Sequence, residues 1–275
     1  QPLYIVDGVT LGNTGLAGIT DSKSGRYAEG VDNGDGLSSI NIDDIENISV
    51  LKGGAASALY GERGANGVIV ITTKKGKRNS LKTEWNSTTT FDQISTKYED
   101  YQTQYGTGSN GRLPLTNDIK NSQNATTSAW GPKFGSPDVM VRIFDGSYKP
   151  YQHVENNIKD FFRTGVTVNN SFSLSGGGEN TTFRASYSNL NATDVIPKSD
   201  LKRNTFTLGV NSQIKKLTID AKFSYIIEDT NNRPSLGDDA SNLGLSVAAL
   251  APNIDQAWLK NYEDENGNYY PWNSD

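Results

Sequence analysis

The chain has 275 residues, of which 34% are hydrophobic, and its formal net charge is −5. This acidic balance leaves no broad basic surface for a phosphate backbone, so nucleic acid is not an expected partner. The absence of cysteine excludes disulfide bonds and thiolate metal sites. The 28 glycines and the many Asn, Ser and Thr residues favour a turn-rich β protein, and no run of about 18 apolar residues predicts a transmembrane helix.

The chain opens with a short apolar segment. Residues 3–6 are predicted to form a strand that ends at the turn pair Asp7 and Gly8. Residues 10–39 are rich in Gly, Asp, Asn and Ser and show little periodicity, which predicts a long loop. Ligand contacts often lie on such loops.

Residues 41–73 are predicted to form a turn, a strand, a short helix and a second strand. Asn41 or Asp43 is expected to cap one helical turn that runs through residue 47. The apolar runs 48–51 and 68–73 are bounded by glycine, which is typical of strands covered on both faces. The segment AASALYG between them is short and rich in helix-forming residues.

Three glycines follow this helical segment at every third position. Gly61, Gly64 and Gly67 indicate a backbone that needs positive φ or close approach to another surface. Their spacing matches neither GxGxxG nor a Walker motif, and a strand follows where a phosphate loop would have a helix. We therefore interpret them as structural glycines.

After Lys77 the pattern changes to strict alternation of apolar and polar residues, typical of strands of about 9–11 residues that cross a bilayer at a tilt. The predicted antiparallel strands lie near residues 81–92, 166–175, 182–190, 204–212 and 217–227. Period two predicts opposite faces for two sets of side chains. Those expected to face lipid are Phe172, Leu174, Phe206, Leu208, Phe223 and Tyr225, and those expected to face the lumen are Arg184, Asp220 and Lys222.

Connector lengths distinguish a barrel from a soluble β-sandwich, which alternation alone also describes. Short connectors are predicted at residues 176–180 and 214–216. Long connectors are predicted at residues 94–165 and 191–202. Alternation of short and long connectors indicates a barrel with short periplasmic turns and longer outer loops.

The segments PLYIVDGV (residues 2–9) and ISVLKGGAASALYGERGANGVIVITTKKGK (residues 48–77) resemble the plug domain of TonB-dependent outer-membrane receptors, and in particular their SusC/RagA branch. The signature positions are Lys52, Gly53, Tyr60, Gly61, Arg63, Gly64 and Gly67. Gly53 stands where that branch often has Asp, and Glu62 where it often has Ser. Residues 156–196 resemble the early barrel strands of the same receptors.

This resemblance implies an α+β plug domain at residues 1-77, truncated at its N-terminus. It implies the beginning of an antiparallel transmembrane β-barrel at residues 78-275, incomplete, with about five strands and long outer loops. The expected location is the Gram-negative outer membrane, and the expected activity is import of an oligosaccharide or peptide without catalysis or cofactor. The implied partners are a SusD-like surface lipoprotein and TonB, whose contact region is expected to lie outside this chain.

Few residues suggest chemistry of another kind. His153 is the single histidine, so neither a catalytic triad nor a two-histidine metal site is expected. Residues 264–268 carry alternating oxygen ligands, but their Gly and Glu are misplaced for a calcium loop, and a turn is the better interpretation. Arg63 is expected to be shielded and to pair with a carboxylate, either as a structural ion pair or as a latch released when TonB pulls.

Aromatic side chains in the predicted outer loops are candidate ligand contacts, because they could stack on sugar rings or peptide side chains. They could equally belong to an interfacial girdle or pack within the loops. The candidates are Trp130, Tyr148, Tyr151, Tyr269, Tyr270 and Trp272. Two alternative functions stay open, a surface glycan-binding β protein without transport and a receptor for siderophores or cobalamin.

Overall fold

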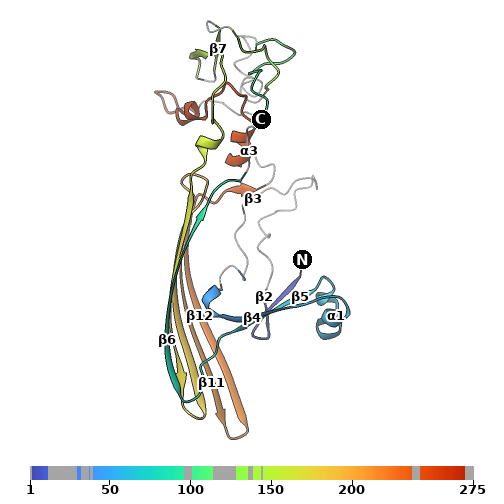
Figure 1. The fold of residues 1–275 in the computed structure, drawn as a ribbon, viewed down its shortest axis with the longest axis vertical. Helices are drawn as coiled ribbons and strands as arrows, with labels where there is room; N and C mark the ends of the chain where they lie inside the picture. Colours follow the sequence, from blue (N-terminus) through green and yellow to red (C-terminus); the bar gives the residue numbers. More distant parts are fainter. Residues whose placement is uncertain are drawn as a thin grey trace. The chain divides into compact units, whose positions relative to one another are not determined.

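The computed structural model describes residues 2–11, 30–31, 37, 40–95, 101–113, 128–135, 139–143, 145–236 and 242–269. The chain divides into two units, each described by itself below (Figure 1). The first unit consists of Gln1–Asp92, Thr164–Asp194 and Lys198–Asp239. The second consists of Gln93–Arg163, Val195–Pro197 and Ala240–Asp275.

The first unit begins with a small mixed sheet, whose strand order is β2-β1-β5-β4. These strands are β1 (Leu3–Val6), β2 (Val9–Leu11), β4 (Ile45–Leu51) and β5 (Val68–Thr73). Strand β1 pairs parallel with β5, and the other pairs are antiparallel. The predicted turn at Asp7 and Gly8 is confirmed, since both residues have positive φ, 48° and 86°, and join β1 to β2.

The helical segment packs on this sheet. Helix α1 (Gly54–Tyr60) and the 3₁₀ turn η2 (Gly61–Gly64) follow β4, as predicted. Ala56 of α1 is fully buried against Ile5 and Val68. The three glycines also behave as predicted. Gly61 and Gly67 have φ of 62° and 91°. A Cβ at Gly64 would lie 2.6 Å from the carbonyl oxygen of Ala56, so this position has no room for a side chain.

The helical turn before β4 is shorter than predicted. It is the 3₁₀ turn η1 (Ile42–Asp44), and the Asn41 side chain caps it by accepting a hydrogen bond from the backbone N–H of Asp43. Strand β4 is also less covered than predicted, since Ile48 and Val50 are 54% and 57% exposed. Burial on both faces is wrong for β4, because it is an edge strand of the sheet. Together β1, β2, η1, β4, α1, η2 and β5 are the N-terminal module.

The largest sheet has the order β12-β11-β10-β9-β6 among the described residues, with antiparallel neighbours throughout, and it is called the wall below. Its strands run side by side beside the N-terminal module (Figure 1). They are β6 (Ser80–Asp92), β9 (Gly165–Gly177), β10 (Thr181–Thr193), β11 (Asp200–Ile214) and β12 (Leu217–Asn231). All five predicted strands are confirmed, and each is longer than predicted.

The connectors of the wall agree only partly with prediction. The tight turns at residues 178–180 and 215–216 are present, and Lys215 has a positive φ of 54°. The connector predicted at residues 191–202 is wrong in length, since β10 and β11 stay paired as far as Thr193 and Asp200. Only residues 194–199 connect them. The backbone pairing continues through residues whose sequence pattern no longer alternates cleanly.

The two faces of the wall differ in polarity. On β9 and β10 the serine side chains, Thr182 and Arg184 are buried, with Arg184 at 7% exposure, and the intervening Phe172 is 49% exposed. Strand register places one aromatic residue of each strand directly opposite the next, which forms a row across the exposed face. This row is Trp85, Phe172, Tyr187, Phe206 and Tyr225. The predicted two-face pattern is therefore confirmed for β9 and β10.

The remaining pairing in the first unit joins β3 (Gly30–Val31) antiparallel to β13 (Ser235–Leu236). The second unit has its own core, built mainly from Val141, Ile143, Tyr151, Val247 and Leu250. Its elements are β7 (Met140–Arg142), β8 (Tyr148–Pro150), η4 (Lys159–Phe161), α3 (Leu243–Ala248) and η5 (Gln256–Lys260). No helix in the described part of the chain is long and apolar enough to cross a membrane.

Candidate functional site: the interface between the N-terminal module and the wall

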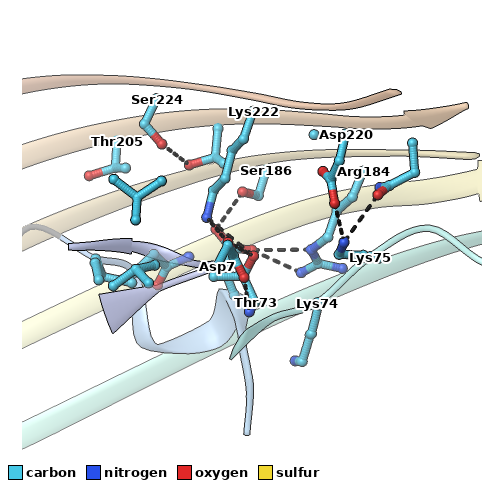
Figure 2. A pocket seen from close by; sticks show the side chains of 18 of the residues that line it. Asp7, Thr73, Lys74, Lys75, Arg184, Ser186, Thr205, Asp220, Lys222 and Ser224 are labelled. Atoms are coloured by element: carbon cyan, nitrogen blue, oxygen red, sulfur yellow. Dashed lines mark hydrogen bonds and ion pairs between the residues drawn. The ribbon is translucent and has the colours of Figure 1, made fainter. Parts of the chain in front are cut away.

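The N-terminal module is held on the polar face of the wall by ion pairs and hydrogen bonds (Figure 2). The most buried pair joins Asp44 of η1 to Arg184 of β10, which are 6% and 7% exposed. Arg184 donates to one oxygen of Asp44 through Nη2 at 3.0 Å and through Nε at 3.2 Å. Ser186 donates to the other oxygen at 2.6 Å. Both carboxylate oxygens are thus satisfied, as a buried charge requires.

Two neighbouring carboxylates extend this contact. Glu84 of β6 accepts a hydrogen bond from Nη1 of Arg184 at 3.3 Å. Asp43 accepts hydrogen bonds from Ser171 of β9 and from Asn86 of β6. The short turn η1 therefore contacts three strands of the wall through two consecutive aspartates.

A second contact lies at the turn between β1 and β2. Asp7 accepts hydrogen bonds from the Thr73 backbone N–H at 2.8 Å, the Thr73 hydroxyl at 2.7 Å and Nζ of Lys222 at 2.9 Å. Partial burial raises the pKa of the Asp7 carboxyl, but the bonds from Thr73 and the charge of Lys222 outweigh it, so that the pKa lies below its usual value of 3.8. Asp7 is therefore ionised near neutral pH and links β1, β5 and β12.

The third contact lies where the chain leaves β5. Lys75 pairs with Asp220 of β12 and donates to Asn211 of β11 at 3.1 Å, but both charged side chains are about half exposed, at 45% and 55%. Gly76 follows at a very close approach to the wall. A Cβ there would overlap the carbonyl oxygen of Phe183 and lie 2.7 Å from that of Gly176. Only glycine fits this crossing point without displacing the wall.

These contacts surround a cavity of about 530 Å³ (Figure 2). Its charged lining includes Asp7, Asp44, Asp220, Arg184 and Lys222, and its remaining polar lining is mostly Ser and Thr from the inner faces of β10, β11 and β12. Apolar side chains complete the lining, namely Val6, Val9, Leu11, Ile40 and Ile226, so the cavity between the N-terminal module and the wall combines charged, polar and apolar surface. No group of three or more His, Asp or Glu side chains in the described residues could hold a metal ion.

The resemblance pointed to another part of the N-terminal module. Lys52, Gly53 and Arg63 are exposed, whereas Gly64 is buried and Tyr60 packs beside the core. None of the seven signature residues lines the cavity. Arg63 makes no ion pair with another described residue, so its pairing with a carboxylate stays a prediction.

The lumen-facing residues of the sequence analysis do reach the interface, since Arg184, Asp220 and Lys222 each bind the N-terminal module. Sequence reasoning missed their partners Asp44, Asp7 and Lys75. The available signal was local: Asp7 belongs to a predicted turn and Asp44 to a predicted helical turn. The pairing between positions about 140 residues apart required the structure.

The candidate aromatic contacts fall into three groups. Trp130, Tyr148 and Tyr269 are exposed, and contact with a ligand stays a prediction for them. Tyr151 is 4% exposed and belongs to the core of the second unit, which agrees with the packing alternative. Burial raises the pKa of its hydroxyl group, which donates to Pro132 at 2.7 Å and accepts from Gly106 at 3.0 Å. Tyr270 and Trp272 lie outside the described residues.

Comparison with known proteins gives the same assignment for the N-terminal residues. Residues 1–68 match the protein family described as TonB-dependent Receptor Plug Domain. The chain is 26% identical over 249 residues to the TonB-dependent receptor SusC of Bacteroides thetaiotaomicron, which covers 90% of this chain and 20% of SusC. It is 27% identical over 220 residues to a TonB-dependent receptor of Formosa agariphila, covering 78% of this chain and 17% of that receptor.

The fold is similar to that of a solved importer. The structure of the RagAB peptide importer in its closed-closed state has a TM-score of 0.56 at 22% identity, covering 84% of this chain and 25% of that chain. The chain spans about a fifth of the length of the curated relatives that it matches. It belongs to the TonB-dependent receptors of the SusC/RagA type, outer-membrane β-barrel proteins, and contains their plug domain and part of their barrel.

Proposed function

We propose that the whole receptor imports a nutrient, an oligosaccharide or a peptide, across the outer membrane. The TonB-dependent receptors are transporters rather than enzymes. The observation that carries the proposal is the interface: the plug binds the polar face of a sheet whose opposite face is apolar and exposed. A plug inside a barrel has to block the lumen and also has to be displaceable, and polar contacts can be exchanged for water.

The interface supports a stepwise displacement of the plug. The pair of Asp44 and Arg184 is buried, the pair of Asp7 and Lys222 is partly exposed, and the pair of Lys75 and Asp220 is about half exposed. Exposed pairs contribute little to stability, since water and salt compete with them. TonB, driven by the inner-membrane proton gradient, would thus break contacts at β1 and at the end of β5 before those at η1.

We further propose a SusD-like surface lipoprotein as the partner that captures the nutrient with the outer loops. The SusC/RagA assignment supports this partner. A surface glycan-binding protein without transport would not need a plug. A receptor for siderophores or cobalamin would use the same plug and wall, so the nutrient must be tested directly.

The test is growth of the source bacterium with this gene deleted, with the parent gene restored, and with the gene restored in a strain that lacks TonB. Mixed oligosaccharides, mixed peptides or chelated iron are supplied as the limiting nutrient. We expect the deletion to lose growth on oligosaccharides or on peptides, and the restored gene to rescue it only when TonB is present. Rescue without TonB, or a defect confined to iron, would refute the proposal.

A further inference from the structure

The second unit contains a cavity that is separate from the interface described above. It has a volume of about 540 Å³, within the range of about 300–1,000 Å³ that is common for small-ligand sites. Its described lining consists of residues 94–95, 101–103 and 153–159, with Leu250 and Pro252 after α3. Segments far apart in the sequence of the second unit therefore form one cavity.

Hydrogen bonds between these stretches fix the cavity walls. The backbone N–H of Val154 donates to the carbonyl of Pro252 at 2.8 Å. Asn157 donates to the carbonyl of Ile254 at 2.6 Å and accepts from the N–H of Gln256 at 2.8 Å. These bonds join the stretch before β9 to the segment after α3, so the cavity is formed before any ligand binds.

The floor of the cavity is aliphatic. Leu250 is 7% exposed within the core of the second unit, and Ile158 packs against that core. Val154 and Ile94 add two more branched side chains to the lining. Branched aliphatic side chains suit a ligand with a compact apolar group, whereas a sugar ring stacks best on a flat aromatic face. Tyr101 is the one aromatic side chain among the described residues that line the cavity.

The rim carries charges of both signs. Glu155 and Lys159 are exposed and line the cavity four residues apart. Neither forms an ion pair or a side-chain hydrogen bond within the described part of the chain, and neither does His153 beside them. A neutral sugar would leave both charges hydrated and would gain no ion pair from them. A ligand that carries an ammonium and a carboxylate could pair with both.

We propose that this cavity binds a short peptide, with an apolar side chain on Ile158 and Leu250 and with its charged groups paired to Glu155 and Lys159. The inference rests on the proposed import function and names the class of nutrient. Aliphatic floor and rim charges together distinguish a peptide from an oligosaccharide.

The experiment measures binding to the purified full-length receptor in detergent micelles, by isothermal titration calorimetry. The probes are trileucine, trileucine with acetylated and amidated ends, and maltotriose. Trileucine is expected to bind, and the blocked form to bind roughly fivefold more weakly, since an exposed ion pair contributes a factor of this order. Maltotriose is expected not to bind.

Variants locate the binding at this cavity. Thr103 is exposed on its lining, so Thr103→Trp should fill the space and raise the Kd for trileucine more than tenfold. Lys159→Glu should raise it roughly fivefold, because the carboxylate of the peptide then meets a like charge. The control is Lys260→Glu, an equal charge reversal at an exposed position of η5 outside the cavity, which should leave the Kd unchanged.

Three results would overturn the inference: no binding of trileucine, binding of maltotriose in its place, or full binding by Thr103→Trp. Growth of the deletion strain, compared with that of the parent strain, decides separately whether the receptor imports a nutrient. Peptide-dependent growth with unaltered binding in Thr103→Trp would refute this cavity and leave the import function standing. Binding at the cavity without any growth defect in the deletion strain would refute the import function and leave the peptide site standing.

Discussion

The inner and outer faces of the wall are built from the same five strands, yet they have opposite polarity. Ser171, Ser173 and Arg184 on the inner face are less than 9% exposed, whereas Phe172 and Phe223 on the outer face are 49% and 63% exposed. In a soluble β-sandwich the apolar face is the buried one. Here the apolar face is the exposed one, which indicates that the outer face contacts an apolar environment such as lipid. The inner face carries the polar groups that hold the plug.

The largest expected effect comes from breaking the buried pair on the inner face. Arg184→Ala leaves Asp44 buried without a cation, and loss of one partner of a buried ion pair costs about 3–5 kcal/mol. We expect the urea midpoint for plug unfolding in the full-length receptor to fall accordingly. Protease accessibility of the plug should rise in parallel, because the plug separates more often from the wall.

Two controls sharpen this prediction. Arg203→Ala removes a cation that pairs with Glu228 within the wall, and it should leave protease accessibility of the plug unchanged. The double variant Asp44→Leu with Arg184→Met removes both charges, and it should lose less stability than Arg184→Ala alone. If the double variant is the less stable of the two, the pair is not isolated from water as the structure indicates.

The apolar character of the outer face can be tested by introducing a charged side chain there. Leu208 is 46% exposed between its cross-strand neighbours Ala185 and Phe223, and an arginine at the bilayer midplane costs about 2–4 kcal/mol. We expect Leu208→Arg to lower the yield of receptor inserted in the membrane and its unfolding free energy in lipid. The matched control is Leu217→Arg, at the end of β12 beside a tight turn, where the same change should cost about 0–1 kcal/mol. Equal costs at both positions would contradict a lipid-facing outer surface.

The two faces also show how far sequence reasoning reaches. Period two predicted the wall strands, because one face of each strand is mainly polar over its central residues. The glycine spacing predicted the constrained backbone at Gly61, Gly64 and Gly67. The pair of Asp44 and Arg184 was out of reach, because nothing local in the sequence selects a partner on another sheet. The length of the connector between β10 and β11 was overestimated. It has only six residues, because strand pairing continues where the alternation weakens.

The lowered pKa of Asp7 should make plug stability sensitive to pH. Its pKa in the folded protein lies below the usual 3.8, so its stabilisation is fully present above that value and is lost as the pH falls through the folded-state pKa. We expect plug stability in the full-length receptor to drop below about pH 4. Asp7→Asn should lower stability near neutral pH by roughly 1.5–3 kcal/mol, the range for hydrogen bonds to a charged group, and should flatten the acid drop. An unchanged acid profile in Asp7→Asn would mean that other carboxylates control it.

The smallest effect is expected for the exposed pair of Lys75 and Asp220. Both side chains are about half in water, so removal of the cation in Lys75→Ala should cost roughly 0.2–1 kcal/mol, and 1 M NaCl should remove most of that difference through screening. Lys75 and Arg184 both bind an aspartate across the same interface, so the two alanine variants compare exposure directly. The measurement is the urea midpoint of each full-length variant at low and at high salt. Burial explains the difference between the two pairs only if the stability lost in Arg184→Ala is still lost at high salt. A large, salt-resistant loss of stability in Lys75→Ala would contradict this explanation. It would mean that the close crossing at Gly76, and not burial, determines how firmly the plug is held.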